Sequence, residues 1–166
     1  SNYAVEAGEH YALHPGKTAV FTKDGQQLAV VGEVHPRSLD AFGLTKKVYL
    51  FEVSLAVLAS QAKLLGAYRH LPKFPAITRD LAVVIDAAAP AAAVEAVICA
   101  NGGELLAETK LFDVYTGEQV PAGCRSLAYS LVFRAPDRTL TDAEVDGYFD
   151  AVVSSLEKTV QARIRA

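Results

Sequence analysis

The chain has 166 residues, of which 51% are apolar and 21% charged, and its net charge is −3. This length and composition allow one ordinary domain or two small ones, and they exclude an intrinsically disordered chain. No apolar run reaches the roughly 18–20 residues of a membrane-spanning helix, and no signal-peptide pattern opens the chain. The two cysteines lack CxxC spacing, which argues against a zinc site or a disulfide framework. We expect a cytoplasmic protein with no membrane partner.

Residues 1–70 have the pattern of an incomplete antiparallel sheet. The predicted elements are strands over 18–22, 28–34 and 48–53 and helices over 37–44 and 55–65. Asp24-Gly25 between the first two strands is a strong hairpin signal. These elements bury little by themselves, and the chain opens at Ser1 and contains no methionine. We therefore interpret residues 1–70 as part of a larger domain followed by a linker helix, within the C-terminal part of a longer protein.

A domain boundary is predicted at the start of residues 71–86, LPKFPAITRDLAVVID. Pro72 and Pro75 fix φ near −65° and remove two backbone donors, so this lead-in is neither helix interior nor central strand. The alternating apolar run that follows predicts a strand. We expect a second domain over residues 71–166.

The second domain is predicted to be α+β. Its expected elements are a strand up to residue 86, a helix after Pro90, strands over 104–115 and 126–134, a helix from Thr141 and a last strand over 162–165. This order of strand, helix, strand, strand, helix, strand predicts a ferredoxin-like plait with both helices on one sheet face. The other face is free to receive a ligand or partner, or to pack against a neighbouring domain.

No residue pattern in the chain indicates catalysis. There is no GxSxG motif and no Cys/His pair at an informative spacing. The four histidines lack the spacing of metal ligands, and the acidic cluster from Asp137 to Asp150 suits a helix start. We expect no catalytic residue, metal or cofactor in this chain.

Positive charges and two aromatic residues near the strand ends predict an RNA contact. The candidate RNA-binding residues are Lys73, Phe74, Arg79, Tyr115, Arg125 and Arg134. The alternative is ordinary surface charge. Residues 72–166 carry nine Lys and Arg against 13 Asp and Glu, about −4, which is unusual for a nucleic-acid binder.

Several motifs resemble a known family. FPAITRDLAVVID, LFDVYTGEQVPAG, SLAYSLVF and RTLTDAEV resemble the ferredoxin-fold anticodon-binding domain of bacterial phenylalanyl-tRNA synthetase β subunits. HPGKTAV, VVGEVHP and VYLFEVSL resemble the end of the inactive catalytic-like domain of the same subunit. The resemblance runs from about His14 onward.

This resemblance implies a non-catalytic piece of a phenylalanine–tRNA ligase that binds the anticodon of tRNA(Phe). It also implies an α2β2 assembly whose α subunits hold ATP, Mg²⁺ and phenylalanine. Arg79 and Asp80 fall on the family's FPxxxRD motif, and we expect Arg79 to lie near RNA or to pair with Asp80. Thr78 and Thr116 stand where many members carry a basic residue, which thins the positive charge. The competing hypothesis is a regulatory ferredoxin-like module that binds an amino acid.

Overall fold

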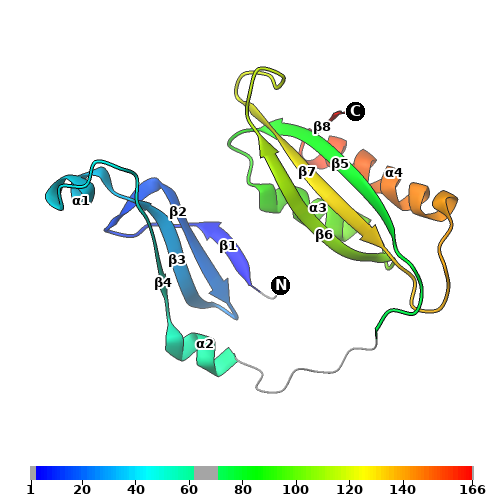
Figure 1. Cartoon of the computed structure of the whole chain (residues 1–166), viewed down its shortest axis with the longest axis horizontal. Helices are drawn as coiled ribbons and strands as arrows, with labels where there is room; N and C mark the ends of the chain where they lie inside the picture. The colour runs from blue at the N-terminus through cyan, green and yellow to red at the C-terminus, as the bar shows by residue number, and fades with distance from the viewer. Residues whose placement is uncertain (1–2, 62–70, 166) are drawn as a thin grey trace. The chain divides into compact units, whose positions relative to one another are not determined.

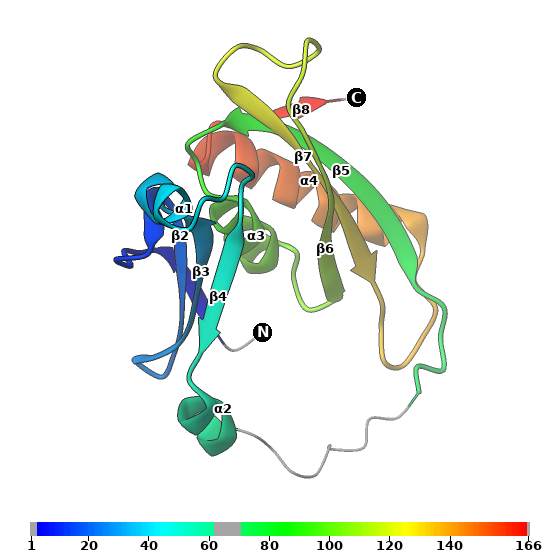
Figure 2. The same ribbon diagram turned by 60° about the vertical axis from the view of Figure 1, so that its left-hand side comes forward.

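The computed structural model describes residues 3–61 and 71–165, which form two compact units (Figure 1, Figure 2). The first unit lies within residues 3–61 and the second within residues 71–165. The predicted domain boundary after residue 70 lies outside the described residues, and so does the end of the helix predicted over 55–65. In these two ranges no helix has the length and apolar character needed to cross a membrane.

The first unit is an antiparallel sheet with the strand order β1-β2-β3-β4 and two short helices. Its elements are β1 (Ala4–Ala7), β2 (Leu13–Lys23), β3 (Gln26–Val34), α1 (Pro36–Ala41), β4 (Tyr49–Val53) and α2 (Leu55–Gln61). Between β2 and β3, Asp24 and Gly25 have φ angles of 50° and 77°, a conformation that glycine adopts at little cost. The predicted Asp-Gly hairpin is therefore confirmed.

Three features of the first unit differ from the prediction, the first being that β2 begins at Leu13, five residues before the predicted start. Strand β1 was not expected, because all four of its residues are exposed and it is defined only by backbone pairing with β2. Helix α1 is shorter than residues 37–44, because the backbone after it turns at Gly43, where φ is 66°. The first unit thus has four strands instead of the three that the pattern predicts.

The second unit confirms the predicted ferredoxin-like plait. Its elements are β5 (Ile77–Asp86), α3 (Ala91–Asn101), β6 (Leu106–Tyr115), β7 (Cys124–Phe133), α4 (Asp142–Thr159) and β8 (Arg163–Arg165). The strand order is β6-β7-β5-β8, and each neighbouring pair is antiparallel. Helices α3 and α4 cover the same face of this sheet (Figure 1, Figure 2).

Burial separates the two faces of the second sheet. The residues of β7 that pack under the helices are each at most 1% exposed: Leu127, Tyr129, Leu131 and Phe133. The Tyr129 hydroxyl donates to the carbonyl of Ala91 on α3 at 3.1 Å, and burial raises the pKa of this tyrosine to about 12. Ala128 and Ser130, which alternate with these core residues, are only half-buried. We call the side on which Ala128 and Ser130 lie the open face, since neither helix of residues 71–165 covers it.

Helix α4 begins at the capping box that the sequence predicts. The Glu144 carboxylate accepts hydrogen bonds from the backbone amide and the hydroxyl of Thr141, both at 2.9 Å. It also accepts one from Arg138 at 3.1 Å. These bonds, the one from the Thr141 amide foremost, lower the pKa of Glu144 from 4.5 to about 2.

Acidification is therefore expected to weaken the second unit through Glu144. The folded pKa lies below the unfolded one, so this contribution is complete above pH 4.5 and is lost as the pH falls toward about 2. Urea midpoints of the unmodified chain and of Glu144→Gln, measured from neutral pH downward, check this. The difference between the urea midpoints of the two proteins should become smaller as the pH falls from 4.5 toward about 2. A difference that stays constant would contradict a stabilising role of the Glu144 carboxylate.

Candidate nucleic-acid interface

A hollow of about 340 Å³ lies on the open face of the second sheet. We call it the Tyr115 hollow, and it is lined by Ala82, Asp113, Tyr115, Gln119, Ser126, Ala128 and Arg165. The strand register brings these residues together, because Ala128 of β7 lies opposite both Ala82 of β5 and Asp113 of β6. Two alanines side by side leave space above the sheet that larger side chains would fill.

An aromatic ring and an arginine border the Tyr115 hollow. The Arg165 guanidinium lies 5.7 Å from the centroid of the Tyr115 ring, within the range of a cation–π contact. Arg165 also donates a hydrogen bond to the side-chain oxygen of Gln119 in the loop after β6. These two contacts hold Arg165, on edge strand β8, against the ring of Tyr115.

This arrangement suits an unpaired nucleobase. The Tyr115 ring, which is 37% exposed, offers a surface on which a base can stack. The Asp113 carboxylate can accept hydrogen bonds from the N–H groups of a base edge, and the Ser126 hydroxyl can donate or accept one. The Tyr115 hollow therefore combines shape, stacking and polar readout.

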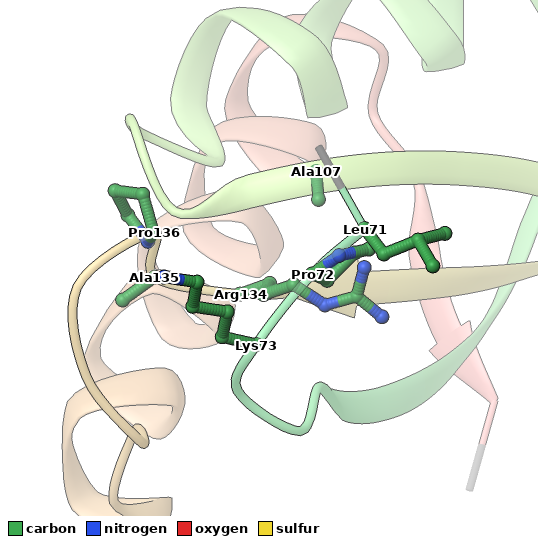
Figure 3. A pocket seen from close by; sticks show the side chains of 7 residues that line it. All are labelled: Leu71, Pro72, Lys73, Ala107, Arg134, Ala135 and Pro136. Carbon is green, nitrogen blue, oxygen red and sulfur yellow. The ribbon is translucent and has the colours of Figure 1, made fainter. Parts of the chain in front are cut away.

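Two of the predicted cations line a second hollow, of about 500 Å³. We call it the Arg134 hollow, and Figure 3 shows its lining residues: Leu71, Pro72, Lys73, Ala107, Arg134, Ala135 and Pro136. They come from the proline-rich lead-in, the start of β6 and the segment after β7. The lead-in and the end of β7 therefore lie close together at this hollow.

The structure places Arg79 away from both hollows. Its Nη2 atom lies 2.6 Å from an Asp142 oxygen and 2.9 Å from an Asp146 oxygen, both on α4. These carboxylates raise the pKa of the guanidinium. Arg79 is opposite the core residue Leu131 in the register, so it belongs to the helix-covered face. The expected local pair with Asp80 is replaced by this link between β5 and α4.

Arg125 also lies on the helix-covered face, opposite Ile85 of β5. Its Nη2 atom donates to the carbonyl of Ala89 at 2.7 Å, just before α3. Phe74 of the lead-in is half-buried. Of the six predicted candidates, the structure thus brings Lys73 and Arg134 together at one hollow and Tyr115 to the other.

Four residues of the Tyr115 hollow were not among the RNA-binding candidates predicted from the sequence: Asp113, Gln119, Ser126 and Arg165. The alternation of β7 was a usable signal for Ser126, since it shares a face with Ala128 and Ser130. Asp113 and Gln119 carried no such signal. A register irregularity between Leu111 and Asp113 decides the face of Asp113, and Gln119 sits in a loop.

Comparison with known families bears on this fold and on this site. The sequence model of the family described as the ferredoxin-fold anticodon binding domain matches residues 72–165. The chain belongs to this family. Residues 1–55 match a second model, described as the phenylalanyl tRNA synthetase beta chain CLM domain. The match covers nearly all of the second unit, including the Tyr115 hollow and every lining residue of the Arg134 hollow except Leu71.

Curated relatives agree with the family assignment. The chain is 43% identical over 165 residues to a phenylalanine–tRNA ligase beta subunit of Clostridium tetani, covering 99% of this chain and 21% of that protein. It is 47% identical over 161 residues to the beta subunit of Moorella thermoacetica, covering 96% and 20%. The chain thus spans about a fifth of the length of these relatives. The predicted resemblance to phenylalanyl-tRNA synthetase β subunits is confirmed.

Because Arg79 is tied to α4, we expect Arg79→Ala to act on stability and to leave RNA affinity unchanged. The Arg79→Ala variant should unfold at a lower temperature than the unmodified chain, because Asp142 and Asp146 at the start of α4 lose the cation that they share. Circular dichroism melts and RNA titrations below the melting range check both parts. Asp146→Asn should mimic the stability loss. A weaker RNA affinity of folded Arg79→Ala would contradict the placement of this residue.

Proposed function

We propose that residues 71–166 bind the anticodon loop of tRNA(Phe) and that the chain performs no bond-making step itself. The observation that supports this most strongly is the Tyr115 hollow, which lies on the open face of an anticodon-binding domain and borders an aromatic ring. The relatives named above are beta subunits of phenylalanine–tRNA ligase, which suggests tRNA(Phe) as the RNA.

Recognition of the anticodon follows from two kinds of contact. Stacking on Tyr115 favours any unpaired base, because every base has a π-face. Sequence preference comes from Asp113 and Ser126, whose oxygens can match the hydrogen-bonding edge of one base and leave another unpaired. We expect the polar pair to supply specificity and the ring to supply affinity.

The same proposal extends to the parent assembly. We expect this chain to act as part of a cytoplasmic α2β2 phenylalanine–tRNA ligase. The α subunits would hold ATP, Mg²⁺ and phenylalanine, and this chain would require no cofactor. Family membership and the relatives' names support this extension.

A binding titration tests the proposal. The full chain is titrated with fluorescently labelled tRNA(Phe) and with the same tRNA carrying a different anticodon. We expect tighter binding to the first, with modest affinity overall because residues 72–166 carry a net charge of about −4. Equal affinity for the two RNAs would overturn anticodon recognition.

A further inference from the structure

Most arginines of the second unit are already engaged by the protein itself. Arg79 pairs with Asp142 and Asp146, and Arg138 pairs with Glu144. Among the residues that the structure describes, the cations of this unit that form no ion pair are Lys73, Lys110, Arg125, Arg134, Lys158, Arg163 and Arg165. Two of them, Lys73 and Arg134, line the Arg134 hollow (Figure 3).

Backbone geometry fixes the position of Arg134. It follows the core residue Phe133, so the alternation along the strand turns its side chain toward the open face. Its amide donates to the carbonyl of Leu105 at 2.8 Å, which ties it to the segment before β6. Its Nε atom is buried and has no hydrogen-bond partner among the described residues. Because this nitrogen is shielded, an oxygen of a ligand can meet the Arg134 guanidinium only at its outer Nη atoms.

The rest of the Arg134 hollow is apolar. Its other lining side chains belong to Leu71, Pro72, Ala107, Ala135 and Pro136. Figure 3 shows the charged ends of Lys73 and Arg134 pointing to different sides of the hollow, so an anionic group beside each of them, with a flat apolar group against the prolines and alanines, would satisfy this surface. An RNA strand has this combination, since its phosphates carry the charge and its bases have flat faces that can stack.

The two hollows lie along one strand. Ala128 lines the Tyr115 hollow and Arg134 lines the other, six residues later, a span of about 20 Å at roughly 3.3 Å per strand residue. One RNA strand crossing the open face can therefore reach both. This continuity favours RNA over an unrelated small anion as the occupant.

We propose that Lys73 and Arg134 form a phosphate-binding subsite for an RNA nucleotide outside the one held at the Tyr115 hollow. This inference rests on the proposed anticodon binding and adds a sequence-independent anchor to it. Phosphate contacts position an RNA, whereas base contacts specify it. The Arg134 hollow thus adds a salt-dependent part of the affinity to the stacking on Tyr115, whereas Asp113 and Ser126 set the choice of sequence.

The test is a salt-dependent titration of the full chain with two stem–loop RNAs, one with the phenylalanine anticodon and one with a different anticodon. Lys73→Ala and Arg134→Ala should each weaken binding about fivefold near 0.1 M salt and reduce the slope of log K against log salt by about 0.7. Both RNAs should be affected equally. Arg134→Lys should keep most of the slope, and Lys158→Ala, at an exposed position of α4, should change nothing.

The outcomes separate this inference from the proposed function. Unchanged affinity and slope in the folded Lys73→Ala/Arg134→Ala double variant, with the unmodified chain still preferring the phenylalanine anticodon, overturn only the phosphate subsite. A loss confined to one of the two RNAs also overturns it, because a phosphate contact does not distinguish sequences. No binding of either RNA by the unmodified chain overturns both proposals. Circular dichroism melts establish that each variant is folded.

Discussion

Replacing Phe133 with alanine is expected to lower the free energy of unfolding of the second unit by about 3–5 kcal/mol. Phe133 has 0% exposure and lies at the end of central strand β7, between Ile77 of β5 and Leu106 of β6. Its ring stacks at 6.5 Å on that of Tyr148 from α4. Removing the ring leaves a cavity where the sheet and α4 meet. Because a typical domain has a free energy of unfolding of about 5–15 kcal/mol, this loss would be a large part of the stability of the second unit.

Urea unfolding of the full chain, followed by circular dichroism, measures this effect. Phe112→Ala is the matched control, because that ring is 54% exposed and the change should stay within about 0.5 kcal/mol. Phe133→Leu should fall between the two. A loss below about 1 kcal/mol for Phe133→Ala would mean that helix α4 does not pack on β7 in solution.

Replacing Tyr115 with alanine is expected to weaken RNA binding by about 1–3 kcal/mol, roughly five- to 150-fold, through the loss of base stacking. The loss should be similar for RNAs with different anticodons, since stacking tolerates any base. Tyr115→Phe keeps the ring and should retain most of the affinity. Fluorescence anisotropy with a labelled anticodon stem–loop measures these constants.

Tyr11 supplies the control for this prediction. It is 92% exposed and lies in the first unit, so Tyr11→Ala should bind RNA like the unmodified chain. If Tyr115→Ala retains full affinity while remaining folded, the Tyr115 hollow is not the site at which a base stacks.

Much of the second unit could be predicted because its local signals agree with one another. The proline-rich lead-in, the capping box at Thr141 and the alternation of β7 each specify one element and together specify the plait. Strand β1 escaped prediction for the opposite reason. Its residues are exposed in this chain, so only pairing with β2 reveals it.

The candidate site was predicted less completely. The alternation of side chains between the two faces of a strand explains which residues were predicted wrongly. Arg79 is two residues before Leu81, and Arg125 is two before Leu127, so alternation places both on the core side of the sheet. Arg134 directly follows the core residue Phe133, so the same alternation turns its side chain toward the open face. The prediction gathered the arginines by their proximity to strand ends and did not apply this rule.

The bulge between Leu111 and Asp113, one of two register irregularities in β6, could not have been predicted from the alternation of residues along the strand. Leu111 lies opposite the core residue Tyr129, yet Asp113 lies opposite Ala128 on the open face. Phe112 is the extra residue that allows the switch, and such bulges re-aim side chains near binding sites. Without it, the carboxylate of Asp113 would face the helices instead of the Tyr115 hollow.

Methyl NMR on alanine-labelled protein tests most directly which surface holds the RNA. The methyl groups of Ala82 and Ala128 line the Tyr115 hollow, whereas Ala96 and Ala100 are exposed on α3, on the opposite side of the sheet. On titration with a phenylalanine anticodon stem–loop, we expect the first pair to shift and the second pair to stay in place. Shifts confined to Ala96 and Ala100 would contradict anticodon binding at the open face.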